Sequence, residues 1–348
     1  MPFAKKEGLG SIPKAAGGIA RLACARLSEL GKDPAPVLAK AGITAEQLSN
    51  RAIWLEVRAQ IRLLELAAAE LQDDLLGFHL ARGFDLREIG LLYYVMASSE
   101  QLDDALQGAE RYSRILNEGI RLRFSLQDRA ATIALDYVNV DRKADRHQVE
   151  FWLVALVRIC RQVTDTRLAP SRLKMRHVRG ETPEEFRTFF GCDVEFGADA
   201  DAVSFTAQLA ALPVASRDEY LNELVRQYAE EALARKSRDR PVLRSKVEEM
   251  LPGLLPHGKA VASEVSRRLG MSSRTLSRKL GEEGTSFAEI LDQLRAVLAK
   301  HYLDDETLPV SEIAWLLGYC EVSSLTHAFK RWTGTTPRQF RALEVGPA

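Results

Sequence analysis

Two stretches in the last 90 residues share one layout, and this layout constrains the fold more than any other feature of the chain. In each, apolar residues first recur every three or four positions, a glycine follows, and a second stretch of the same period begins close to a serine. The first covers residues 259–284 and the second covers residues 310–334. A helix, a tight turn and another helix make a helix-turn-helix unit, so the pattern predicts two such units in tandem.

In the first unit, Gly270 supplies the turn, and Ser272 or Ser273 can cap the second helix. Leu276 and Leu280 lie four residues apart and form the buried side of that helix. A helix of this kind fits the major groove of DNA and distinguishes base edges with side chains on its exposed side. The residues expected to face DNA are Ser273, Arg274, Ser277, Arg278 and Lys279.

In the second unit, Ser311 is expected to cap the first helix, and Ser323 or Ser324 to open the second. Leu325 and Phe329 are its expected apolar anchors. The residues left for the groove and its phosphates are Ser323, Ser324, Thr326, His327, Lys330 and Arg331.

Residues 287–303, between the units, carry apolar side chains every three or four positions and predict a continuous spacer helix. Two recognition helices can enter successive grooves only if they lie about 10–10.5 base pairs apart. A stiff spacer sets that distance, whereas a flexible linker would not.

The segment from Lys259 to Arg341 resembles the DNA-binding domain of the AraC/XylS family of transcription regulators. The matching strings are Leu269-Gly270-Met271-Ser272, Arg274-Thr275-Leu276-Ser277-Arg278, Leu317-Gly318-Tyr319, Ala328-Phe329-Lys330-Arg331-Trp332-Thr333-Gly334 and Thr336-Pro337. The chain departs from the family at His327, where relatives usually carry Arg, and at Cys320-Glu321, where a polar pair that begins with Ser is common. The resemblance implies double-stranded DNA as a partner, and RNA polymerase as a further one.

The first 235 residues predict an α+β domain in which helices cover a small antiparallel sheet. Helices are expected over 18–30, 33–49, 58–73, 75–84, 90–119 (broken at Ser98-Ser99, with Ser99 capping the second part), 147–164 and 218–236. Strands are expected over 120–127, 130–138, 171–180, 192–196 and 202–207, the first two as a hairpin. The domains so predicted are a flexible tail (1–17), an effector-binding and dimerisation domain (18–235), a linker (236–242) and an all-α DNA-binding domain (243–341).

The N-terminal half also resembles the effector domain of one AraC subgroup, the subgroup with an arabinose-binding-like domain. The matching strings are Gly31-Lys32-Asp33-Pro34, Leu63-Leu64-Glu65-Leu66-Ala67-Ala68 and Gly90-Leu91-Leu92. This resemblance implies that the domain senses a small molecule and forms a homodimer. It does not name the molecule.

Five residues are candidates for an effector site. Tyr93, Tyr94, Tyr112 and Trp152 suit a pocket with aromatic walls, and Arg111 can hold a carboxylate. Ordinary core packing of the aromatic residues, and solvation of the arginine on a helix surface, are the competing interpretations.

Charge and cysteine content narrow the class of protein. Lys and Arg together number 48, and so do Asp and Glu, so DNA binding must come from placed charges rather than from a basic surface. Four scattered cysteines without metal-ligand spacing predict buried free thiols, no metal and no cofactor. No apolar run reaches 18 residues, so we expect a cytoplasmic protein with no contact with the membrane.

Three functions fit a chain of this kind: an effector-responsive regulator, a constitutive regulator whose N-terminal half only dimerises, and an enzyme fused to a DNA reader. The third is disfavoured because no catalytic motif occurs. We therefore expect a sequence-specific regulator that is not an enzyme, and an activator that responds to a small molecule.

Overall fold

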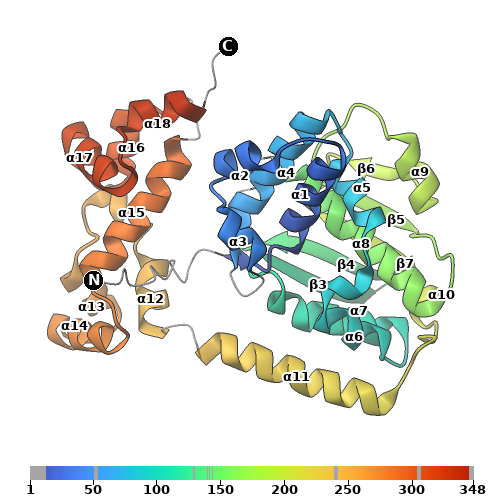
Figure 1. Ribbon diagram of the computed structural model, residues 1–348. Helices are drawn as coiled ribbons and strands as arrows, with labels where there is room; N and C mark the ends of the chain where they lie inside the picture. The colour runs from blue at the N-terminus through green and yellow to red at the C-terminus, as the bar shows by residue number, and fades with distance from the viewer. Residues whose placement is uncertain are drawn as a thin grey trace. The chain divides into compact units, whose positions relative to one another are not determined.

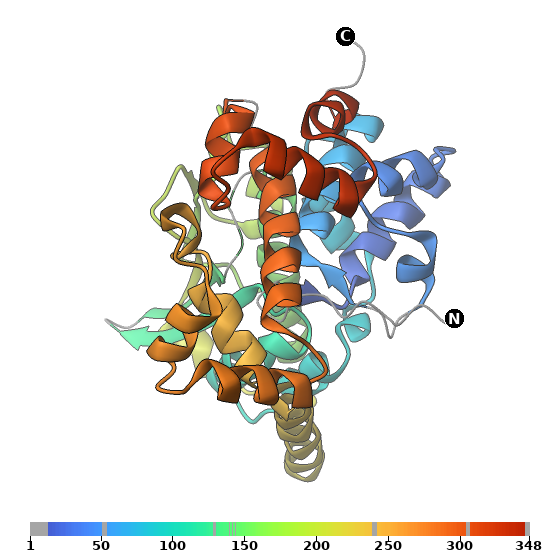
Figure 2. The same ribbon diagram turned by 90° about the vertical axis from the view of Figure 1, so that its left-hand side faces the viewer.

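The chain forms two compact units, which we call the N-terminal unit (Pro13–Arg235) and the C-terminal unit (Lys236–Ala348). A computed structural model describes residues 13–50, 54–127, 130–138, 140, 142, 144–238, 242–303 and 307–344. Figures 1 and 2 show the elements of each unit from two sides. Among the described residues, no helix has the length and apolar content needed to cross a membrane.

The N-terminal unit is built from α-helices, two short 3₁₀ helices and seven strands. Its helices are α1 (Gly18–Glu29), α2 (Pro34–Ala41), α3 (Ala45–Ser49), α4 (Val57–Leu71), α5 (Leu76–Gly83), η1 (Leu86–Ile89), α6 (Leu91–Ala97), α7 (Leu102–Tyr112), η2 (Ser113–Ile115), α8 (Arg146–Thr164), α9 (Glu184–Phe190), α10 (Ala207–Ala210) and α11 (Glu219–Arg238). Its strands are β1 (Lys14–Ala15), β2 (Leu55–Glu56), β3 (Ile120–Gln127), β4 (Ala130–Tyr137), β5 (Arg172–Met175), β6 (Val194–Phe196) and β7 (Asp201–Thr206).

The main sheet has the order β3-β4-β7-β5-β6. On β4, Ala131, Ile133 and Leu135 are buried, because alternate side chains of a strand point to the same face. This alternation confirms the predicted hairpin, although residues 128 and 129 at its tip lie outside the described part of the chain. The sheet is antiparallel, as predicted, except for one pair, β5 with β6, which is parallel. A parallel pair needs a crossover, and the unpredicted helix α9 lies within that connection.

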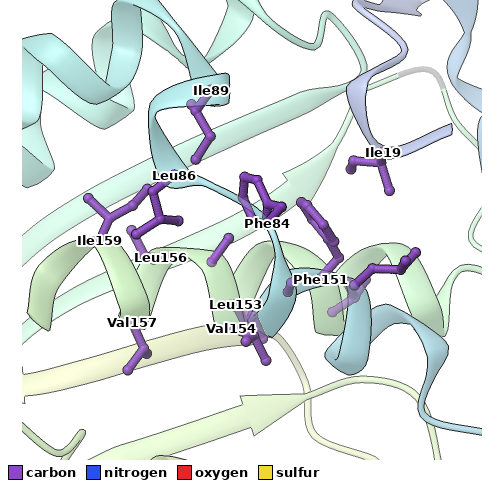
Figure 3. Close-up of a cluster of buried hydrophobic side chains, with 14 of the residues drawn as sticks. Ile19, Phe84, Leu86, Ile89, Phe151, Leu153, Val154, Leu156, Val157 and Ile159 are labelled. Atoms are coloured by element: carbon purple, nitrogen blue, oxygen red, sulfur yellow. The ribbon is translucent and has the colours of Figure 1, made fainter. Parts of the chain in front are cut away.

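Helix α8 lies at the centre of the unit and packs on both α5 and β7. Because neighbours cover it on several sides, its buried residues are not confined to one stripe. Figure 3 shows part of this core, including Phe151 of α8, whose ring stacks on Phe84 with 5.2 Å between centroids.

The structure corrects three local predictions in this unit. The expected helix over 33–49 is two helices, because Gly42 takes a left-handed conformation with φ of 73°. Ser99 does not cap α7; its hydroxyl donates to Val95 O of the preceding helix. Lys14 and Ala15, assigned to the flexible tail, form β1 and pair with β2. Residues 1–12 of that tail, and residues 239–241 of the expected linker, lie outside the described residues.

The C-terminal unit is all helical. Its elements are α12 (Val242–Met250), η3 (Leu255–His257), α13 (Ala262–Arg268), α14 (Ser273–Glu282), α15 (Phe287–Leu303), α16 (Val310–Leu316), α17 (Val322–Thr333) and α18 (Pro337–Glu344). It has two apolar cores, and α15 contributes to both: Ile290 and Leu294 to the first, Ala299 and Leu303 to the second. Figure 2 shows α15 running between the two helix-turn-helix units.

Helix starts in the second helix-turn-helix unit differ from the prediction. Ser311 does not cap α16, which begins at Val310 with Pro309 as its N-cap residue. Neither Ser323 nor Ser324 caps α17, which begins at Val322 after Glu321. Instead, the hydroxyl of Ser323 donates to the Glu321 carboxylate at 3.0 Å. The four cysteines are free, as expected, but only Cys24 and Cys160 are buried; Cys192 is half-buried and Cys320 is exposed.

Gly318, in the turn of the second unit, lies against the first core. A Cβ atom placed there would meet the backbone oxygen of Leu255 at 2.5 Å. Gly270, in the equivalent turn of the first unit, has no atom within 4 Å of such a Cβ. Both glycines have positive φ, 73° and 67°, so they form a matched pair that differs only in the space around them.

We expect Gly318→Ala to destabilise the C-terminal unit more than Gly270→Ala does. Both changes strain the left-handed backbone, at about 1 kcal/mol. Gly318→Ala adds the cost of displacing the Leu255 backbone, about 1–3 kcal/mol. Urea unfolding of the two full-length variants, followed by circular dichroism, measures the difference. Equal losses would contradict the close approach.

Candidate nucleic-acid interface

Helix α14 presents one apolar and one polar side. Ser272 caps it by accepting a hydrogen bond from the Thr275 amide at 3.2 Å, which resolves the choice between Ser272 and Ser273. Leu276 and Leu280 are fully buried. The predicted DNA-facing residues of this unit are all exposed: Ser273, Arg274, Ser277, Arg278 and Lys279. Because its apolar side stays packed in the core, α14 can place its polar side in a DNA groove without any change in its own packing.

Helix α17 has the same division of its surface. Leu325, Ala328 and Phe329 are its buried residues. The predicted residues that are exposed on it are Ser323, Ser324, His327, Lys330 and Arg331. Thr326 is only half exposed, and its hydroxyl donates to Val322 O one turn earlier at 2.9 Å, so it is bonded within its own helix.

The spacer helix holds α17 through one carboxylate. Asp292 of α15 accepts from Arg331 at 2.6 Å and from the indole N–H of Trp332 at 2.9 Å. Arg331, predicted to contact phosphate, is therefore paired in the free protein. No local sequence pattern marks Asp292 as functional, since a lone acidic residue in an amphipathic helix usually faces solvent.

Arg295 of α15 binds the turn of the second unit. Its Nε donates to Leu317 O at 2.9 Å, and its guanidinium lies 4.5 Å from the centre of the Tyr319 ring. Leu317 closes α16, so the arginine satisfies one of the carbonyls that a helix leaves free at its C-terminus. Together with Asp292, this contact fixes the second unit to the spacer.

The first unit is joined to the same spacer by a second polar network. The Glu283 carboxylate accepts from the Leu243 and Arg244 amides at 3.0 and 2.9 Å. Arg244 in turn donates to Glu248 at 2.8 Å and to Gln293 of α15 at 2.9 Å. Side chains thus bond the second unit directly to α15 and the first unit to α15 through α12, in addition to the apolar contacts.

The arginines of the first unit differ in how far their charge is already neutralised. Arg267 and Arg268 both donate to Glu264, and these bonds hold the pKa of that carboxyl at about 2. Arg278 pairs with Glu282, one turn along α14. Arg274 and Lys279 form no ion pair within the part of the chain that the structure describes. These two cations are therefore open to phosphates.

Two of the five effector candidates face α11 rather than a cavity. Arg111 Nε and the Tyr112 hydroxyl both bind the Glu230 carboxylate, the hydroxyl at 2.7 Å. The Arg111 bond holds the pKa of Glu230 below its usual value. This pair of contacts joins α7 to α11.

The other three candidates do not gather in one place either. Tyr93 accepts from the Gln162 side chain at 2.7 Å, and the exposed Tyr94 packs edge-on against Tyr93. Trp152 alone among the five lines a pocket near α1, η1 and α8. The polar side chains around that pocket come from separate elements, so no local sequence pattern pointed to them.

Comparison with known proteins agrees with this geometry. The family model "Arabinose-binding domain of AraC transcription regulator" matches residues 31–214, just over half of the chain, and a helix-turn-helix domain model matches residues 265–343. The chain is similar to the HTH-type transcriptional regulator VirS of Mycobacterium tuberculosis, at 27% identity over 319 residues that cover 91% of this chain and 93% of VirS. It is also similar to the ornithine utilization regulator of Pseudomonas aeruginosa, at 28% identity over 274 residues, covering 76% and 78% of the two chains.

The two matched domains occur in the same order as the N-terminal and C-terminal units, and they cover the α+β unit and both helix-turn-helix units. The chain therefore belongs to the AraC family of DNA-binding transcription regulators, which are not enzymes.

Proposed function

We propose that this protein is an effector-responsive activator that inserts α14 and α17 into two successive major grooves on one face of DNA. The observation that carries the proposal is the attachment of both units to α15. Each unit shares an apolar core with α15; Asp292 and Arg295 bond the second unit directly, and Gln293 bonds Arg244 of α12, whose backbone amide donates to Glu283 of the first unit. Two recognition helices that are already held at a fixed distance can enter two grooves without the ordering of a flexible linker. Less conformational entropy is therefore lost on binding.

Within this arrangement, Arg274, Ser277 and Arg278 contact base edges in the first groove, while Lys279 contacts phosphate. Ser323 and His327 contact the second groove, with Ser273, Ser324, Thr326, Lys330 and Arg331 at the phosphates. Arginine pairs well with guanine because its planar guanidinium can donate to O6 and N7 together. Arg278 and Arg331 must break their ion pairs with carboxylates before they contact DNA. They therefore contribute more to sequence specificity than to the long-range electrostatic attraction between the protein and DNA.

The N-terminal unit supplies a homodimer interface. Helix α11 exposes Tyr220, Leu224 and Tyr228 at four-residue spacing, with 73%, 37% and 61% of their surface accessible. Large apolar side chains in one row on a helix support packing against a second copy. The same observation favours a second candidate function, a constitutive dimeric regulator without an effector.

Regulation then follows from linkage. An effector that binds one arrangement of the dimer more tightly than another shifts the population of the arrangement that binds DNA. As an activator in the cytoplasm, the DNA-bound dimer acts on RNA polymerase.

Selection of binding sites from random DNA by the full-length protein, with and without candidate metabolites, tests the proposal. We expect two short conserved blocks about one helical turn apart, with affinity that depends on a metabolite. Affinity that no metabolite changes would favour the constitutive alternative. Transcription in vitro from the selected site distinguishes activation from repression.

We expect Arg278→Ala to weaken binding to the selected site by about 1–3 kcal/mol and to relax the preference at one or two base pairs. Arg172→Ala is a matched control, because Arg172 is equally exposed (60% against 61%) and also pairs with a glutamate, but lies on the sheet of the N-terminal unit. Fluorescence anisotropy with specific and random DNA measures both. An equal loss of affinity for the two DNAs would show that Arg278 contacts only phosphate.

Insertion of five base pairs between the two blocks should lower affinity by orders of magnitude. Half a helical turn rotates one block to the opposite face, where α15 does not allow the second recognition helix to follow. Insertion of the same five base pairs outside the blocks is the control. Unchanged affinity for the first insertion would mean that only one of the two units enters a groove.

A further inference from the structure

A pocket with about 110 Å³ of free volume lies in the N-terminal unit. Its apolar wall comes from α1, the segment around η1, the residues after η2, and α8. The wall residues are Ile19, Leu22, Phe84, Ile89, Leu116 and Phe151. Figure 3 shows Ile19, Phe84, Ile89 and Phe151 in this region of the core. One buried water needs only about 10–15 Å³, so the space suits a molecule of several non-hydrogen atoms.

Three uncharged polar side chains interrupt this apolar wall, in addition to the charged Arg21 and Glu88: Gln60 of α4, Asn117 after η2, and Trp152 of α8. Gln60 and Asn117 are almost fully buried, with 1% and 2% of their surface accessible. Each residue carries one buried atom with no hydrogen-bond partner among the described residues: Gln60 Oε1, Asn117 Nδ2 and Trp152 Nε1. A buried polar atom without a partner costs about 1–3 kcal/mol, so three around one cavity require an explanation.

Hydrogen bonds to other residues engage one polar atom of each amide side chain and so determine which atom remains available to a ligand. Asn117 Oδ1 accepts from the Gly119 amide at 2.9 Å, so its NH₂ group remains. Gln60 Nε2 donates to Gln148 at 2.8 Å, and Gln148 donates to the Tyr137 hydroxyl at 2.9 Å, so Gln60 Oε1 remains. Together with the Trp152 indole N–H, these amides therefore offer two donors and one acceptor.

We propose that this pocket binds a small, mainly apolar molecule with one uncharged polar head group that accepts two hydrogen bonds and donates one. A carboxamide or a hydroxyl meets this requirement, since each has an oxygen with two lone pairs and a hydrogen to donate. The head group accepts from Asn117 and Trp152 and donates to Gln60, while the apolar part contacts the wall.

The charges around the pocket also favour a neutral ligand. Arg21 and Glu88 both line it and carry opposite charges, so the lining as a whole has no net charge. Apart from Arg21, whose Nη1 is also buried and whose Nη2 donates to Ala16 O at 2.9 Å, the buried polar groups are two amides and an indole, which cannot compensate an ion. Removing a carboxylate or an ammonium from water without a partner of opposite charge is far more costly than removing an uncharged group.

The effector role of such a ligand rests on the proposed function, but its binding does not. The wall joins α1, α4, η1 and α8, so a bound molecule would bring together elements that lie far apart in the sequence. Because it binds only the folded unit, it would also raise the melting temperature.

Three six-carbon probes test the proposal on the full-length wild-type protein in a ligand-observed NMR titration: hexanamide, hexanoate and hexylammonium. We expect hexanamide to bind with a dissociation constant on the order of 1 mM, because a ligand of eight non-hydrogen atoms can gain only a few kcal/mol of binding free energy. We expect the two ions to bind at least about tenfold more weakly. Absence of hexanamide binding would show that the pocket holds only water. Preference for hexanoate would show that Arg21 selects an anion. Preference for hexylammonium would show that Glu88 selects a cation. Each of these three results overturns the proposal.

Two variants locate the binding. Trp152→Phe keeps an aromatic side chain, although a smaller one, and removes the indole N–H; Asn117→Asp keeps the acceptor for Gly119 but removes the Nδ2 donor. Each should weaken hexanamide binding by about 3- to 10-fold, provided that circular dichroism shows a folded unit. Trp315→Phe, an exposed tryptophan in the C-terminal unit, is the matched control and should leave binding unchanged. Unchanged binding by both folded pocket variants would place the probe elsewhere.

The two proposals fail in different ways. If hexanamide binds but leaves the affinity for the selected DNA site unchanged, the pocket stands and the effector response through it fails. If the protein selects no DNA site, the proposed function fails whatever the probes do.

Discussion

The spacer helix α15 is the element on which the arrangement of the C-terminal unit depends. Its 17 residues span about 25 Å, and its two ends belong to two different apolar cores. A continuous helix between the cores keeps them at one distance and one rotation, because every intervening backbone group is hydrogen-bonded within it. Asp292 and Arg295 then fix the second unit around that axis. The separation of α14 and α17 is thus a property of one helix rather than of a loop.

Charge supports the same view of how the protein engages DNA. A chain with as many acidic as basic residues has little general attraction for phosphate. Carboxylates of the protein itself reduce that attraction further, since Glu264 forms ion pairs with Arg267 and Arg268, and Asp292 forms one with Arg331. This charge distribution supports the proposed binding mode, in which close contacts in the grooves supply the affinity and the protein selects few sites rather than coating DNA.

The N-terminal unit depends on α8 in a comparable way. This helix carries a fully buried carboxylate, Glu150, which accepts from Arg179 at 2.7 Å and lies 3.0 Å from His177 Nε2. It also carries Gln148, which links Gln60 at the pocket to Tyr137 on the sheet. Such networks are sensitive to small shifts, because a buried group that loses its partner is costly. A ligand that contacts α8 would therefore act on an element that packs against helices and the sheet alike.

The sequence alone determined the elements whose signal is local. The apolar period of 287–303, the alternation of β4 and the glycine turns at 270 and 318 were sufficient to predict the spacer, the hairpin and both helix-turn-helix units. Tertiary structure decided what depends on distant neighbours. It paired β5 with β6 in parallel, and it placed Gly77 where a Cβ would meet the His147 backbone of α8 at 1.9 Å. It also brought polar atoms of Gln60, Asn117 and Trp152 to one cavity. Periodicity within a helix or strand is set by residues a few positions apart, whereas these contacts join residues up to about a hundred positions apart and exist only once the core has packed.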